Sequence, residues 1–300
     1  MLKKIILHIG LPKAGSSSLQ VNYLRYLEDE THGYGGIWPL MNIGQGNFSM
    51  TETESLRHDK LRPLWRKYKS TCDPALLHEI ASFVNKPTVI LSNEVTTGAH
   101  RYYCPIPIQE RISKIVSYFQ QRDIEIAFLL CVRNPAKFLL SHYYDYPISY
   151  TQKNILGKDK VLSLESWMSE RFMNKEFVGT IRKSFPDKIR DAAYPYPLHT
   201  INLDDLQGDW LSWITKCHRL IGLPQALLPE NVSTDRFNYG VGELHIAKCR
   251  AASYSYFLGR VFSFIWRKSD KVPFWQFLNS RRQVISQDLL VEITKIIDEF

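Results

Sequence analysis

Three short apolar runs constrain the fold most strongly. They cover residues 3–9 (KKIILHI), 88–92 (TVILS) and 125–132 (EIAFLLCV), and a weaker run covers 198–203 (LHTINL). Runs that are apolar along their whole length are typical of strands buried on both faces of a sheet. Segments with apolar residues at helical spacing separate these runs. The pattern predicts an α/β fold with a central parallel sheet flanked by helices.

The domain organisation follows from the same alternation of predicted strands and helices. The chain has 300 residues, enough for one large domain. We expect a single domain over residues 1–300, with an α/β core over 1–225 and a mainly helical C-terminal extension over 226–300. We expect residues 31–70 to form a long irregular insertion, because this segment contains five glycines and shows little hydrophobic periodicity until its end. Residues 143–160 are aromatic, polar and basic, which predicts a surface loop.

The charge of the chain favours an anionic partner. Lys and Arg number 38 against 30 Asp and Glu, a net charge of +8. Nucleotides, acidic glycans, nucleic acids and membrane surfaces would all suit this surplus. The chain contains no recognisable RNA- or DNA-binding module, so nucleic acid is not expected as a partner. Peripheral contact with a membrane stays open.

The cysteines and the first residues bear on location. The five cysteines are odd in number and have no CxxC or metal-ligand spacing, which favours reduced thiols. The apolar run at residues 3–9 is too short for a signal peptide, and no stretch approaches the length of a membrane span. We therefore expect a cytoplasmic protein without a transmembrane segment.

A candidate anion-binding turn follows the first run. Residues 10–18 (GLPKAGSSS) lie between that run and a helix whose apolar face is Leu19, Tyr23 and Leu27. A strand, a turn and a helix N-terminus gather backbone N–H groups around one point, which suits a phosphate. Lys13 adds a full positive charge there. Small side chains would let an anion reach the backbone at Ala14, Gly15, Ser16, Ser17 and Ser18.

The turn is not a nucleoside triphosphate kinase motif. Gly10 and Gly15 have the spacing of a Walker A loop, but Ser16 stands where that loop needs lysine. A kinase that uses Mg²⁺ is therefore disfavoured. A strand–helix turn with an incidental lysine remains the alternative.

Two motifs resemble one enzyme family. Residues 12–18 (PKAGSSS) resemble the 5′-phosphosulfate-binding loop of sulfotransferases that use 3′-phosphoadenosine 5′-phosphosulfate (PAPS), although Ala14 replaces the commoner Ser or Thr. After the third run, Arg133-Asn134-Pro135 with Ser141 resembles the 3′-phosphate motif of that family. Weaker likeness to bacterial and carbohydrate sulfotransferases extends from residue 3 to about 225. Two such elements in order, each after a buried strand, are hard to produce by chance.

The resemblance implies a P-loop-like sulfotransferase fold and a set of roles. PAPS would be the donor, and no metal would be needed. Lys13 and the backbone of residues 14–18 would stabilise charge on the leaving phosphate oxygen, while Arg133 and Ser141 would anchor the 3′-phosphate. Arg133 also suits this role chemically, because a guanidinium offers a forked cation.

The base that removes the acceptor proton is less certain. Glu94 is the first choice, because it follows the second run and parallel sheets bind ligands at the carboxyl ends of their strands. A structural role at the end of the strand is an equal alternative. Histidine is the base in other branches of the family, so His100 and His142 also qualify. His8 lies inside the first run and is expected to be packed.

The acceptor is inferred from weak features. A hydroxyl acceptor is required, and tyrosines clustered near the motifs suit sugar rings, although ordinary packing explains them equally. By analogy with the family we expect a carbohydrate. The alternatives are a P-loop phosphotransferase and a non-catalytic nucleotide-binding protein.

Overall fold

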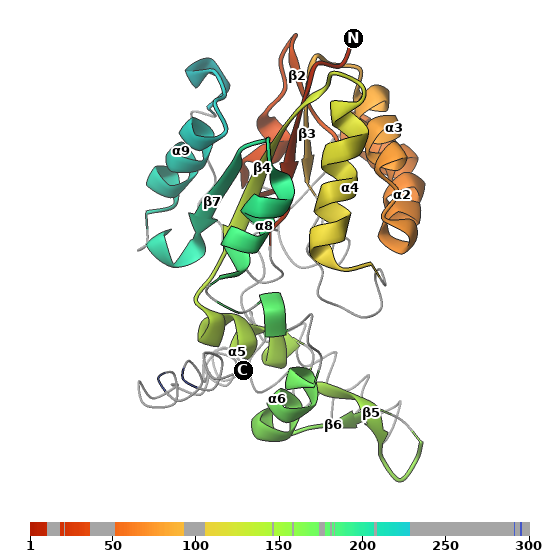
Figure 1. Ribbon diagram of the computed structural model, residues 1–300, viewed down its shortest axis with the longest axis vertical. Helices are drawn as coiled ribbons and strands as arrows, with labels where there is room; N and C mark the ends of the chain where they lie inside the picture. The colour runs from red at the N-terminus through yellow and green to blue at the C-terminus, as the bar shows by residue number, and fades with distance from the viewer. Residues whose placement is uncertain are drawn as a thin grey trace. The chain divides into compact units, whose positions relative to one another are not determined.

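A computed structural model provides the structure of the chain. It describes residues 1–10, 19–20, 22–36, 52–92, 106–145, 147–157, 159–173, 178–180, 182, 184–206, 209–228, 291 and 295. The chain forms two compact units (Figure 1). The first comprises Met1–Arg133 and Lys183–Phe237, and the second Asn134–Arg182 and Asn238–Phe300.

The first unit is built on a five-stranded sheet with the order β2-β3-β1-β4-β7. All four strand pairings are parallel. The strands are β1 (Lys4–His8), β2 (His32–Tyr34), β3 (Thr88–Ser92), β4 (Glu125–Val132) and β7 (Leu198–Asn202). The four apolar runs of the sequence are therefore confirmed as parallel strands, and the predicted α/β class is confirmed with them.

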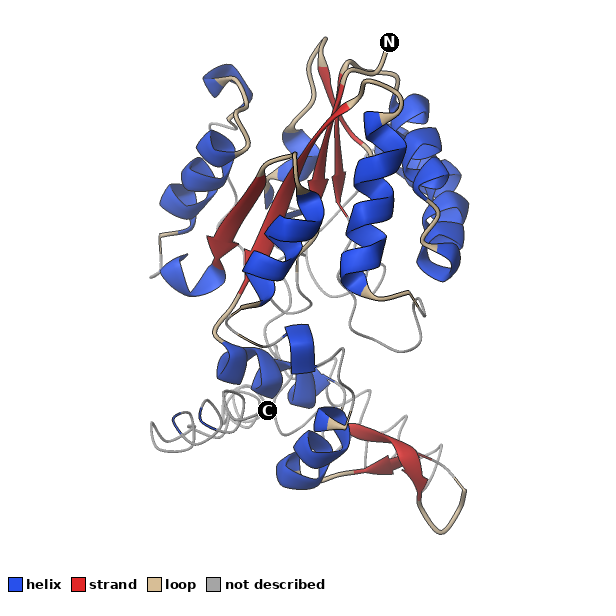
Figure 2. Ribbon diagram, viewed as in Figure 1, coloured by secondary structure: helices blue, strands red, loops and turns tan. Residues whose placement is uncertain are grey.

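Helices flank the sheet on both sides (Figure 2). The helices of this unit are α2 (Glu52–Thr71), α3 (Pro74–Val84), α4 (Ile108–Gln120), α8 (Phe185–Ala193) and α9 (Trp210–Leu220), with 3₁₀ turns at Leu24–Tyr26, Leu203–Leu206 and Gln225–Leu227. Helix α4 packs on α8, and α2 packs on α3. Helix α9 is tied to the segment after β1, because the Tyr23 hydroxyl lies 2.8 Å from His218 Nδ1.

The predicted irregular insertion over residues 31–70 is wrong in two places. Strand β2 opens this stretch, and α2 occupies its end with Leu61, Trp65 and Tyr68 buried. The glycine of β2 serves close packing rather than irregularity: a Cβ on Gly33 would lie 2.5 Å from Val84 Cγ1 of α3. Trp65 Nε1 donates to the Gly35 carbonyl at 2.9 Å, which holds α2 against the edge strand.

The second unit contains α5 (Pro135–Asp145), β5 (Ile148–Lys153), β6 (Asp159–Val161) and α6 (Leu164–Phe172). Strands β5 and β6 form an antiparallel hairpin, so the prediction of a surface loop at residues 143–160 is wrong. A partly buried polar anchor explains the difference. The hydroxyls of Ser149 and Thr151 both donate to the Glu170 carboxylate of α6, and Gly157 has a φ of +69° in the hairpin turn.

The cysteines differ from expectation. Cys72 is disulfide-bonded, whereas Cys131 and Cys217 are buried free thiols. The expectation of reduced thiols throughout is therefore wrong, and the cysteines no longer favour a cytoplasmic location. Within the part of the chain that the structure describes, no helix is both long and apolar enough to cross a membrane.

Candidate functional site

The predicted site residues divide into two groups. The turn with Lys13, Ala14, Gly15, Ser16, Ser17 and Ser18 lies outside the described residues, as do Glu94 and His100. Arg133, Ser141 and His142 are described. The structure describes the strands that precede the turn and Glu94, whereas the roles of these residues stay predictions.

The segments carrying these residues leave from neighbouring strands. In the sheet, β1 lies between β3 and β4, and its last residue, His8, is in register with Ser92 of β3 and Leu129 of β4. The chain enters the Lys13 turn after β1, reaches Glu94 two residues after β3, and reaches Arg133 directly after β4. Parallel strands about 4.8 Å apart therefore deliver all three segments from one edge. The strand order also reverses at β1, which is where open α/β sheets bind ligands.

A buried polar cluster occupies this edge. His8 Nδ1 lies 2.7 Å from Ser92 Oγ, and Gln20 Nε2 donates to the same oxygen at 2.8 Å. His8 and Ser92 are fully buried, and Gln20 is 5% exposed. The prediction that His8 is packed is confirmed, whereas its polar partners Ser92 and Gln20 were not predicted. A histidine at the end of an otherwise apolar strand was the available signal.

Burial sets the charge state of His8. Burial lowers the pKa of His8 from 6.5 to about 3, so the imidazole is neutral. Ser92 Oγ accepts from Gln20 Nε2 and shares a second hydrogen bond with His8 Nδ1, in which the tautomer of the ring decides which group donates. His8 Nε2 is buried and has no hydrogen-bond partner among the described residues.

We expect the neutral His8 to make the fold sensitive to acid. Below pH 6.5 His8 is protonated in the unfolded chain, whereas in the folded protein it stays neutral down to about pH 3. The free energy of unfolding therefore falls as the pH falls from 6.5 to about 3. Between pH 7 and pH 5 the loss from His8 alone should be about 2 kcal/mol. Urea unfolding at both pH values should show a loss that is smaller by about this amount in His8→Gln. An identical pH dependence in both proteins would contradict the assignment.

Arg133 and its neighbours form the junction from strand to helix that the sequence predicts. The Asn134 Oδ1 accepts from the backbone N–H groups of Ala136 (3.0 Å) and Lys137 (3.2 Å), which caps α5. Pro135 begins the helix, as predicted. These contacts fix the backbone directly after Arg133, whose side chain is half-buried.

Ser141 lies in α5, also half-buried. Arg133 belongs to the first compact unit and Ser141 to the second. Their joint contact with one phosphate therefore stays a prediction.

His142 is packed among aromatic rings. It is 4% exposed, and its ring centroid lies 5.7 Å from those of Phe138 and Trp167. The neighbouring Tyr143 is also buried and donates its hydroxyl to the Leu162 carbonyl at 3.1 Å. These surroundings favour packing roles for both residues within the second unit.

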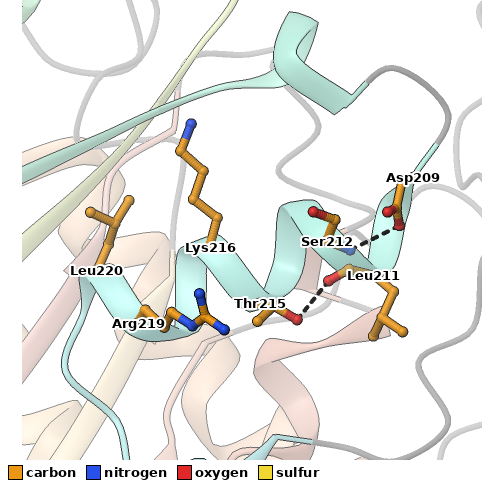
Figure 3. A pocket seen from close by; sticks show the side chains of 7 residues that line it. All are labelled: Asp209, Leu211, Ser212, Thr215, Lys216, Arg219 and Leu220. Carbon is orange, nitrogen blue, oxygen red and sulfur yellow. Dashed lines mark hydrogen bonds between the residues drawn. The ribbon is translucent and has the colours of Figure 1, made fainter.

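A hollow of about 510 Å³ lies over α9 (Figure 3). It is lined by Asp209, Leu211, Ser212, Thr215, Lys216, Arg219 and Leu220. Two of its polar side chains have partners: the Thr215 hydroxyl donates to the Leu211 carbonyl, and Lys216 Nζ lies 3.0 Å from Asp205. None of the predicted site residues lines it. Within the described ranges, no group of His, Cys, Asp or Glu is arranged to hold a metal ion.

No family model matches the chain, and no curated protein matches its sequence. Among solved structures, it is similar to a sulfotransferase from Alicyclobacillus acidocaldarius, with 13% identity, a TM-score of 0.43, and coverage of 92% of this chain and 100% of that one.

Two further structures are similar to the chain. Mouse sulfotransferase SULT7A1 complexed with PAP has 13% identity and a TM-score of 0.37, covering 93% of this chain and 89% of that one. The sulfotransferase domain from the curacin biosynthetic pathway has 12% identity and a TM-score of 0.31, covering 98% of each chain. All three are sulfotransferases. The likeness is loose, and we transfer no residue role from it.

Proposed function

We propose that this protein is a sulfotransferase that moves the sulfuryl group of PAPS to a hydroxyl of an acceptor. One observation carries the proposal: the two motif segments follow β1 and β4, which are hydrogen-bonded neighbours in the same parallel sheet. The Lys13 turn and Arg133 therefore leave the sheet at one edge. Two anion-binding segments at one edge suit a donor with two separate phosphate groups.

The proposed roles follow from what sulfuryl transfer needs. Lys13 and the turn over residues 14–18 neutralise the charge that builds on the leaving phosphate oxygen. Arg133 binds the 3′-phosphate with its forked donors, and Ser141 adds a hydroxyl. Asn134 supports this by capping α5 and fixing the chain directly after Arg133. No metal takes part in these roles.

The acceptor side of the proposal is supported by the position of β3. Glu94 follows β3, the other neighbour of β1, and so leaves the sheet beside the Lys13 turn. A carboxylate there can remove the proton of an attacking hydroxyl. We propose a carbohydrate as the acceptor and one functional domain over residues 1–300, because the chain leaves the sheet at Arg133 and returns to it at β7. Nucleic acid is not a partner in this proposal.

Calorimetric titration with adenosine 3′,5′-bisphosphate tests the donor. The wild-type protein should bind it at micromolar concentration and should not prefer ATP–Mg²⁺. Arg133→Ala should weaken binding by at least about 100-fold, because several hydrogen bonds to a charged phosphate are lost.

Arg122→Ala is the matched control. Arg122 precedes the same strand at the opposite edge, where its guanidinium stacks 3.7 Å from the Tyr118 ring centroid. Its loss should leave the affinity unchanged. A preference for ATP–Mg²⁺ would favour a phosphotransferase, and no nucleotide binding at all would refute the proposed function.

A further inference from the structure

We propose that the turn of the β5–β6 hairpin is an interfacial anchor, whose Ile155 and Leu156 side chains insert into the surface of an anionic lipid bilayer. The inference does not depend on the proposed function, because none of the residues assigned to donor binding or proton removal lies in the hairpin. It rests on the geometry of the turn, on its exposed apolar side chains and on the charge beside them.

Local hydrogen bonds hold the backbone of the turn in one conformation (Figure 1). Asn154 Oδ1 accepts from the backbone N–H of Leu156 at 2.9 Å, and the Asn154 carbonyl accepts from the N–H of Gly157, also at 2.9 Å. Gly157 has a φ of +69°, in the left-handed region that glycine enters without strain. Asn154 and Gly157 therefore supply what the turn requires, and its geometry does not call for an aliphatic residue between them.

The base of the hairpin is also fixed. The Thr151 hydroxyl donates to the Glu170 carboxylate at 2.9 Å, and the Ser149 hydroxyl donates to the same group. Arg171 Nη2 donates to the Ile148 carbonyl at 3.1 Å. Because Glu170 and Arg171 belong to α6, this helix supports β5, and the turn extends from an ordered base.

Two adjacent aliphatic side chains project from the turn. Ile155 is 92% exposed and Leu156 is 54% exposed, so neither contributes much to a core. A single exposed aliphatic residue is ordinary on a protein surface. A neighbouring pair at the end of a hairpin forms a small apolar element that can reach below lipid headgroups. Such an element binds a bilayer in proportion to the apolar area that it buries there.

The charge beside the turn favours an anionic bilayer. Residues 153–160 (KNILGKDK) contain three lysines and one aspartate, a net charge of +2. Lys153 pairs with Asp159 across the hairpin, and Lys160 is exposed on β6. A lysine can lay its apolar stem along the acyl region while its ammonium group stays among the headgroups. The net charge of +8 on the whole chain adds attraction at longer range.

A protein partner fits the turn less well than a bilayer does. A stable protein interface buries about 800 Å² on each partner, far more than two aliphatic side chains can supply. Lysine is also depleted in such interfaces. A bilayer needs no surface of matching shape, and limited insertion combined with charge attraction gives a weak, reversible contact.

Vesicle co-sedimentation tests the anchor. The wild-type protein should bind vesicles of phosphatidylcholine with about 30% phosphatidylserine more tightly than vesicles of phosphatidylcholine alone. The double variant Ile155→Ser/Leu156→Ser should bind the anionic vesicles about 10- to 100-fold more weakly, because two side chains no longer leave water. Both side chains are exposed, so this variant should keep the melting temperature of the wild-type protein.

Leu56→Ser is the matched control. Leu56 has a similar exposed fraction, 58%, but lies on α2 in the first unit. Its substitution should leave the affinity for both kinds of vesicle unchanged. Lys160→Ala should weaken binding to the anionic vesicles by about fivefold and leave binding to phosphatidylcholine alone unchanged, because the lysine acts through charge.

Tryptophan fluorescence reports insertion directly. Ile155→Trp should be quenched by lipids brominated on their acyl chains more strongly than the wild-type protein is, whereas Leu56→Trp should show no extra quenching. A wild-type protein that binds neither kind of vesicle would overturn the inference. So would equal affinities of the wild-type protein and the double variant, since the net charge would then account for binding without the turn. Absence of extra quenching in Ile155→Trp would overturn it as well.

Discussion

Replacing Lys13 with methionine should lower the turnover number for sulfuryl transfer by about 10²- to 10³-fold, the usual loss when one group that stabilises transition-state charge is removed. Negative charge grows on the phosphate oxygen as the bond to sulfur breaks. Lys13 follows β1 in the sequence, and parallel sheets bind ligands at the carboxyl ends of their strands, so we expect Lys13 to neutralise that charge. Methionine keeps the length of the side chain and removes only the cation.

The measurement is steady-state transfer of labelled sulfate to the best acceptor from a glycan screen. Binding of adenosine 3′,5′-bisphosphate should fall much less than turnover, because the charge on the leaving oxygen develops only during reaction. Lys3→Met is the control, since Lys3 is exposed just before β1 at the other edge of the sheet. A turnover number within a few-fold of wild type would remove Lys13 from the catalytic step.

Glu94→Gln should lower turnover by hundreds of fold while nucleotide affinity holds. Glutamine has the shape of glutamate but cannot accept the proton of the attacking hydroxyl, and a positioned base contributes about 10²- to 10⁴-fold. Glu94 follows β3 by two residues in the sequence, and β3 is paired in parallel with β1, so we expect this residue beside the Lys13 turn. Donor binding does not need the base, so the two measurements should separate.

A pH–rate profile sharpens this test. The rate of the wild-type enzyme should fall at acidic pH, where the base becomes protonated. The Glu94→Gln variant should not show this decrease at acidic pH. Glu125→Gln is the control, since Glu125 begins β4 at the opposite edge and pairs there with Lys4 at 2.8 Å. Unchanged turnover in Glu94→Gln would transfer the role to a histidine, with His100 tested first because His142 is packed among aromatic rings.

The central strands could be predicted from sequence because burial on both faces leaves a direct signal. Residues 125–132 are apolar at almost every position, since helices cover both sides of β4. Strand β2 has no such signal. Its sequence is HGY, and Gly33 is there to let Val84 approach, a contact set by tertiary packing rather than by local pattern.

The sequence indicates the candidate site only through its linear motifs, whose roles stay predictions. The turn at Lys13 and the Arg133-Asn134-Pro135 junction are contiguous, so their chemistry can be read along the chain. The cluster of His8, Gln20 and Ser92 is not contiguous, because strand pairing joins residues far apart in sequence. The disulfide at Cys72 was missed for the same reason: spacing along a chain does not reveal which cysteines meet.

The strand order also shapes how the chain must fold. Strand β1 is synthesised first, yet its two partners are residues 88–92 and 125–132. Its apolar residues therefore stay unpaired in the nascent chain until both partner strands have been made. Sheets assembled from such distant pairings fold slowly, because the entropy of closing long loops is lost before the strands form stabilising contacts with each other. An apolar strand that is made before its partners stays exposed and is prone to aggregation. The translation rate up to residue 132, and chaperone binding before that point, should therefore determine how much of this protein reaches its native state.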